Sequence, residues 1–158
     1  MSKLTAPDHG GSTFVAWVFP TPLAVDAAEL RVKGLEQQHR LSVKERATVM
    51  WLQGEKQPKI VRHSSGGHAV GKGALWGGIL GTIVGGPVGG AAVGAAVAGS
   101  ASRLRRAHLP ADVLASVRDE MRPGRSALLV LVDSPDEDLL TVVAGQETGV
   151  TVLRAELA

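Results

Sequence analysis

Apolar residues in this chain follow the two-residue period of strands in some segments and the helical period in others. Residues 13–19 (TFVAWVF) and 126–133 (SALLVLVD) are continuous apolar runs, which are typical of strands buried on both faces. Residues 151–157 (TVLRAEL) alternate between a largely apolar side and a largely charged side, which predicts a half-buried strand. Residues 45–53 and 58–64 flank the turn-like GEKQ and predict a β-hairpin.

Residues 22–40 carry apolar side chains at helical spacing. Pro22 follows Thr21, a favoured way to begin a helix. Arg31, Lys33 and Glu36 fall mostly outside the apolar positions, so we expect an amphipathic helix. Its apolar stripe consists of Leu23, Ala27, Leu30 and Gly34, with Ala24, Ala28 and Leu35 beside it.

Two shorter helices are predicted in the second half of the chain. Residues 110–121 begin with proline and end before Gly124. The apolar side of this helix consists of Val113, Leu114, Val117 and Met121. Residues 134–145 open with Ser134, Pro135 and Glu137, a capping box with proline at the first helical position.

The expected element order is β-α-β-β, a glycine-rich block, then α-β-α-β. Without the block, the first six elements spell βαββαβ, the ferredoxin-like arrangement, and the last helix and strand extend it. We therefore expect an α+β fold, a ferredoxin-like sandwich with an inserted glycine-zipper helical hairpin and an extra C-terminal αβ unit. The expected boundaries are 1–12 for a disordered lead, 13–65 for the first part of the αβ domain, 66–104 for the hairpin and 105–158 for the second part.

The glycine-rich block repeats its glycines every four residues. Residues four apart share a helix face, so each row of glycines is a groove that another backbone can approach closely. The glycines to which we assign close helix packing are Gly77, Gly81, Gly85, Gly89, Gly90 and Gly94. Larger residues cover the other side of the first half, and we expect Trp76, Leu80 and Ile83 to contact lipid or a neighbouring subunit.

Pro87, within VGGPVGG, predicts a turn between two helices over residues 74–84 and 88–103. At 1.5 Å per residue these helices would be about 16 and 24 Å long, shorter than a hydrocarbon core of roughly 30 Å. Three interpretations remain open: a re-entrant hairpin in one leaflet, the buried contact of a homo-oligomer, or a hairpin packed inside a soluble monomer.

Basic residues flank the block on both sides: Lys72 before it and Arg103, Arg105 and Arg106 after it. Basic residues at both ends of a membrane hairpin favour the cytoplasmic side for both ends, where they would contact anionic headgroups. The alternative is a solvated helix end, since arginines there also favour the helix dipole.

Composition narrows the function classes. The chain of 158 residues favours one compact domain carrying one large insertion. A formal net charge of +2, without basic stripes interleaved with aromatic residues, argues against nucleic-acid binding. The absence of cysteine removes disulfides and thiolate chemistry and fits a reducing cytoplasm. The N-terminal MSKLTAPDHGGST lacks the apolar region of a secretory signal.

No set of residues predicts a reaction, a cofactor or a metal. The stretch GGHAVGKG is close to a phosphate-binding loop, but Gly73 stands where the Mg²⁺-binding hydroxyl belongs, so we expect no nucleotide. His63 and His68 have no nearby carboxylate or cysteine to complete a metal site. Acidic runs at 119–120 and 136–138 lie at helix surfaces and starts, where they favour capping. The chain is therefore expected not to be an enzyme.

Several stretches together resemble a known family. These are GKGALWGGILGTIVGGPVGGAAVGAAVAG, the short helix after it, GRSALLVLV and the terminal TVLRAEL. They are similar to a bacterial domain-of-unknown-function family of predicted membrane proteins that pair a ferredoxin-like αβ part with a glycine-zipper hairpin. The resemblance runs from about Phe14 to Leu157. It implies membrane association and self-assembly, and it implies no reaction.

The expected function is that of a non-enzymatic, membrane-associated structural protein at the cytoplasmic face of the bacterial membrane. Its expected partners are membrane lipid and further copies of itself. The alternative is a cytoplasmic homo-oligomer, such as a ring, shell or filament, packed through the same hairpin. A third hypothesis, a regulator that binds a small molecule on the sandwich, rests on analogy of fold alone.

Overall fold

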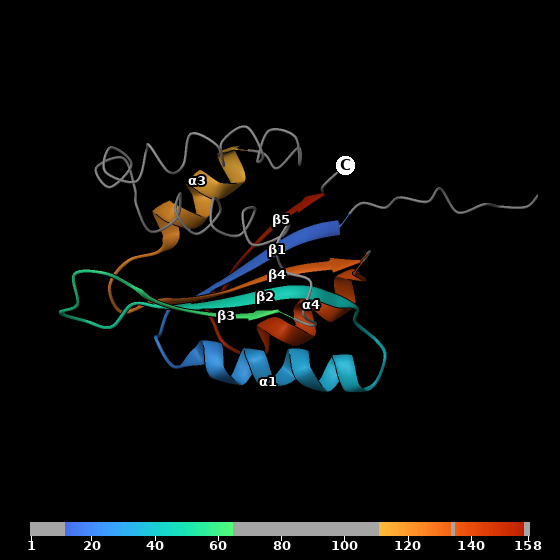
Figure 1. Cartoon of the computed structure of the whole chain (residues 1–158). Helices are drawn as coiled ribbons and strands as arrows, with labels where there is room; N and C mark the ends of the chain where they lie inside the picture. The colour runs from blue at the N-terminus through green and yellow to red at the C-terminus, as the bar shows by residue number, and fades with distance from the viewer. Residues whose placement is uncertain (1–11, 65–110, 134, 157–158) are drawn as a thin grey trace, which may run out of the picture.

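The computed structural model describes residues 12–64, 111–133 and 135–156 (Figure 1). The predicted order of strands and helices in these ranges is confirmed. The elements are β1 (Ser12–Phe19), α1 (Ala24–Gln37), β2 (Val43–Met50), β3 (Lys59–Ser64), α3 (Ala111–Glu120), β4 (Ser126–Asp133), α4 (Glu137–Ala144) and β5 (Thr151–Glu156).

The five strands form one antiparallel sheet in the order β3-β2-β4-β1-β5. Strand β4 lies at its centre and pairs with β1 on one side and β2 on the other; Leu128, for example, lies between Trp17 and Thr48. The first described range supplies β1, β2 and β3, and the later ranges supply β4 and β5. Strands from both sides of the glycine-rich block therefore share one sheet.

The α+β class is confirmed, but this strand order does not confirm the ferredoxin-like arrangement. An α+β sandwich of that kind keeps its helices on one face of the sheet. Here α1 and α4 cover one face and α3 lies on the other, so the described part has three layers (Figure 1).

The face covered by α1 and α4 contains two large aromatic residues of β1. Trp17 and Phe19 are fully buried there between β1 and the two helices. The indole Nε1 of Trp17 donates a hydrogen bond to the carbonyl oxygen of Leu140 in α4, at 3.0 Å. Arg31 of α1 donates from Nε to the carbonyl oxygen of Val143, at 3.0 Å. Each of these contacts ties a helix to the sheet or to its neighbouring helix.

Gly145, which follows α4, is shaped by the same contacts. Its φ of +69° lies in the left-handed region that side chains rarely adopt. A Cβ atom built on it would lie 2.7 Å from Nη2 of Arg31. A glycine at this position thus lets the guanidinium approach the last carbonyl groups of α4, the favourable place for a cation at a helix end.

The opposite face is packed by α3 alone among the described helices. Leu114 and Val117 of α3 are buried against it, as predicted, with Met121 directly after the helix, and Val113 packs at the margin. Beneath them the strands present smaller side chains, including Ala16, Ala47 and Ala127. The helix lies over β5 and β1 rather than over the edge formed by β3 (Figure 1).

The predicted apolar stripe of α1 is not its buried side. Leu23 and Leu30 are 70% and 67% exposed, and a Cβ atom on Gly34 would meet nothing within 4 Å. The buried residues of α1 are Ala24, Val25, Ala28, Val32 and Leu35, so of the predicted apolar side only the residues beside the stripe are buried. This side prevails because it is also apolar at helical spacing and brings Arg31 within reach of α4.

The ends of two helices also differ from the prediction. Helix α1 begins at Ala24 after Leu23, without a side-chain cap, rather than at Pro22. Helix α4 begins at Glu137 after Asp136, so the capping box predicted at Ser134 is wrong. Asp136 has extended backbone angles and makes no side-chain cap hydrogen bond, while Glu137 and Asp138 place negative charge in the first turn.

Candidate functional site

The predicted site residues lie outside the described residues. This applies to the packing glycines Gly77, Gly81, Gly85, Gly89, Gly90 and Gly94, the contact residues Trp76, Leu80 and Ile83, and the basic residues Lys72, Arg103, Arg105 and Arg106. The structure does describe the two elements on either side of these residues: β3, which ends at Ser64, and α3, which begins at Ala111.

These two points are directed toward the same end of the sheet. Strands β3 and β4 both pair antiparallel with β2, so they run in the same direction. Ser64, the last residue of β3, shares a row of the sheet with Leu131 near the end of β4. Helix α3 runs back to the start of β4, so its first residue, Ala111, points toward the end at which β3 stops (Figure 1). The chain therefore leaves at an edge strand and returns over the α3 face.

A buried carboxylate lies beside the point of departure. Glu45 of β2 is 3% exposed and occupies the row between Leu131 and Ser64, on the α3 face. A carboxylate in such a place requires a polar or charged partner, and Glu45 is not left without one. Sequence reasoning treated this residue only as the start of a strand. The available signal was its two-residue spacing from the apolar Ala47 and Val49, which puts all three on one face.

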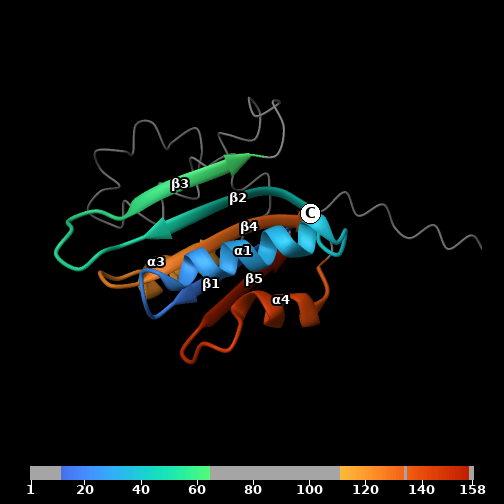
Figure 2. The same cartoon turned by 90° about the horizontal axis from the view of Figure 1, so that it is seen from below.

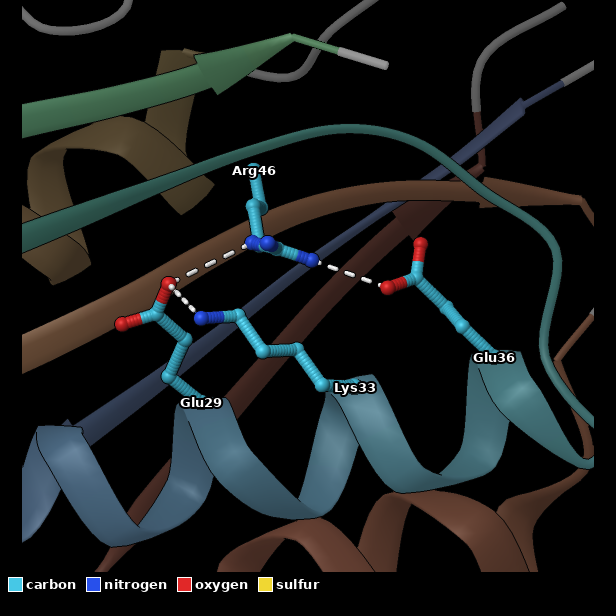
Figure 3. Close-up of polar contacts among 4 residues, drawn as sticks. All are labelled: Glu29, Lys33, Glu36 and Arg46. Carbon is cyan, nitrogen blue, oxygen red and sulfur yellow. Dashed lines mark hydrogen bonds and ion pairs between the residues drawn. The ribbon is translucent and has the colours of Figure 1, made fainter.

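A partly buried cluster of charges lies on the opposite face, between α1 and β2 (Figure 3). Arg46 of β2 donates from Nη1 to Oε2 of Glu36 at 2.8 Å, and its Nε lies 3.4 Å from Oε1 of Glu29. Lys33 is on the other side of the same Glu29 oxygen, at 3.6 Å. The sequence placed Lys33 and Glu36 outside the apolar stripe but did not identify Arg46 as their partner, since that contact depends on how the helix sits on the sheet.

This cluster, Glu29, Lys33, Glu36 and Arg46, has two positive and two negative side chains. The charges balance, so the cluster has no surplus that would attract an ionic ligand. Its geometry joins the middle and end of α1 to β2. We interpret it as a structural connection between helix and sheet rather than as a binding site.

The described part of the chain contains neither a candidate metal site nor a candidate membrane-spanning helix. No group of three or more histidine, cysteine, aspartate or glutamate side chains is arranged there to hold a metal ion. Within the same residues, no helix combines the length and apolarity needed to cross a membrane.

Comparison with known proteins places the chain in a family. No curated protein matches it, and no solved structure matches it. Residues 70–158, more than half of the chain, match the family model described as "Protein of unknown function (DUF1269)". The resemblance identified from the sequence is thus confirmed at the level of an uncharacterised domain family. The chain belongs to the DUF1269 family.

Proposed function

We propose that this protein is a non-enzymatic, membrane-associated structural protein that inserts or self-assembles through a glycine-zipper hairpin formed by residues 66–104. Its αβ part would lie in the cytoplasm, with the hairpin at the inner face of a bacterial cytoplasmic membrane. Membrane lipid and other copies of the chain are its proposed partners.

The observation that carries this proposal is the direction of the two chain ends around the glycine-rich block. Ser64 ends β3 and Ala111 begins α3 toward the same end of the sheet. Departure and return at one end support a hairpin, in which the Gly-Gly-Pro at 85–87 would supply the turn. Two short helices joined by that turn suit a re-entrant hairpin or a packed oligomeric contact better than a single crossing.

The proposed roles of individual residues rest on the sequence pattern of the block. The glycine rows allow the two helices, or helices of neighbouring copies, to approach closely. Trp76, Leu80 and Ile83 contact lipid or a neighbouring subunit. Basic residues at both ends of the hairpin meet anionic headgroups at one surface, where each contributes about 1 kcal/mol of binding free energy; they are Lys72, Arg103, Arg105 and Arg106.

Fractionation of cells expressing the full chain tests the proposal. We expect the protein in the membrane fraction after an alkaline carbonate wash, because an inserted hairpin resists conditions that strip peripheral proteins. Recovery without detergent as a large, uniform particle would replace membrane insertion by a cytoplasmic assembly packed through the same segment. Recovery as a soluble monomer would contradict both insertion and self-assembly.

A matched pair of variants tests the glycine groove itself. Gly81→Leu fills the centre of the first row and should abolish membrane retention or assembly, whereas Gly81→Ala adds one methyl group and should retain most of it. Far-ultraviolet circular dichroism and a cooperative unfolding transition check that the αβ part of both variants is folded. Normal retention and assembly of a folded Gly81→Leu protein would contradict the assigned role of the groove.

A further inference from the structure

The outer side of α1 carries an apolar stripe that no described element covers. Figure 2 looks onto this helix, and no other described helix or strand lies over it. The stripe consists of Leu23, Ala27, Leu30 and Gly34, with spacings of four, three and four residues. That spacing keeps all four positions on one side of a helix, as in the contact seam of a helix pair.

Exposure distinguishes this stripe from ordinary scattered surface residues. Leu23 and Leu30 have the two highest exposures among the exposed large apolar residues of the described part. The others, Leu52, Val61, Val142 and Val152, are distributed over a loop, two edge strands and another helix. Single exposed apolar residues need no explanation, but two on one face, with only small residues beside them, indicate a contact surface.

The order of large and small residues makes the stripe complementary to itself. Read forward it is Leu, Ala, Leu, Gly, and read backward it is Gly, Leu, Ala, Leu. When a second copy of α1 lies antiparallel to the first, with the two-fold axis midway between Ala27 and Leu30, each leucine of one copy faces a small residue of the other. Leu23 faces Gly34 of the second copy, where the space for a side chain is open, and Leu30 faces Ala27.

Charge favours the same arrangement. Asp26 and Lys33 lie seven residues apart on one flank of the stripe. A two-fold axis through the centre of the stripe brings Asp26 of each copy toward Lys33 of the other, which gives two opposite-charge pairs.

We propose that the outer stripe of α1 binds α1 of a second copy of this chain, antiparallel and around a two-fold axis. The contact is separate from the glycine-rich hairpin and does not depend on the proposed membrane function. Four residues on one helix bury less than the roughly 800 Å² per partner of a standard interface. The contact is therefore weak by itself and strongest between copies that another contact already holds together.

Cysteine cross-linking in the full chain tests the pairing, since the chain has no cysteine of its own. Proteins carrying Leu23→Cys and Gly34→Cys are mixed and oxidised gently. These positions face each other in the antiparallel pair, whereas two Leu23→Cys residues lie roughly 16 Å apart along the axis, too far for a disulfide. We expect about tenfold more cross-linked dimer in the mixture than in either variant alone, because of this separation.

Two controls complete the test. Leu52→Cys, on the exposed loop after β2, measures cross-linking by random collision. Asp26→Lys should reduce the cross-link between positions 23 and 34 several-fold, because it brings like charges together beside Lys33 of the other copy, and Asp26→Asn should reduce it less, because it only removes the attraction. Cross-linking of the mixture no greater than that of Leu52→Cys would overturn the proposal, as would equal cross-linking of Leu23→Cys alone.

Discussion

The two faces of the sheet are buried in different ways. On one face, α1 and α4 lie side by side, and hydrogen bonds from Trp17 and Arg31 fix α4 to β1 and to α1. On the other face, the ten-residue α3 packs over β5 and β1 above strands with several alanines. Both faces contain residues with no exposed surface. The first face is held by specific polar contacts between its elements, and the second mainly by apolar packing.

The two faces also differ in their distance from the glycine-rich segment. The α1 and α4 face is complete within the described part of the chain, with its charged cluster joining helix to strand. The α3 face borders the points where the chain departs at Ser64 and returns at Ala111, and it contains the buried Glu45. A change in the glycine-rich segment should therefore affect the α3 face before it affects the other.

The largest expected effect comes from two adjacent leucines of β4 that face opposite sides. Leu128 lies on the α1 and α4 face and Leu129 on the α3 face, and both are fully buried. We expect Leu128→Ala to lower the free energy of unfolding by about 4–5 kcal/mol and Leu129→Ala by about 2–3 kcal/mol, because the fixed helices relax less around a cavity. Urea denaturation measures both. An equal or larger loss for Leu129→Ala would show that the faces are packed equally tightly.

A smaller effect is expected from the charged cluster. Arg46→Met keeps the aliphatic length but removes the contacts to Glu29 and Glu36, and it should lower the free energy of unfolding by about 1–2 kcal/mol. Lys33→Met removes a single exposed ion pair and should cost less than about 0.5 kcal/mol. Thermal and urea unfolding of the two variants compare them directly. Comparable losses would contradict the view that Arg46 is the centre of the cluster.

A change of similarly small size tests which side of α1 is packed. Gly34 lies inside the helix with open space around it, so Gly34→Ala should raise the free energy of unfolding by about 0.5–1 kcal/mol. Gly149 also has room for a methyl group, but its φ is +82°, so Gly149→Ala should lower stability by roughly 1–2 kcal/mol. Destabilisation by Gly34→Ala would mean that the outer side of α1 is covered.

Local patterns predicted the elements well because each depends on neighbouring residues. The apolar run of β4 and the apolar side of α3 both follow from short-range spacing, and both are confirmed. The orientation of α1 was wrong because the helix has two apolar sides. Choosing between Leu30 and Val32 requires the shape of the sheet and the position of α4, which lie far away in sequence.

The strand order and the charged cluster could not be predicted from local patterns, because both depend on contacts between residues far apart in the sequence. The insertion of β4 between β1 and β2 is decided by pairings across the glycine-rich segment, which no local pattern encodes. Arg46 becomes recognisable as the centre of a charge cluster only once β2 lies beneath α1. The site predicted in the glycine-rich segment remains a prediction, since its residues lie outside the described part.

The central position of β4 also fixes an order of events during synthesis. Strands β1 and β2 leave the ribosome first, but β4, the strand that lies between them, is absent until residues 126–133 have been made. Domains form as units while the chain grows from its N-terminus, and here the glycine-rich segment emerges before the strand that completes the sheet. The nascent chain thus carries the whole glycine-rich segment before the central strand of the sheet beside it exists.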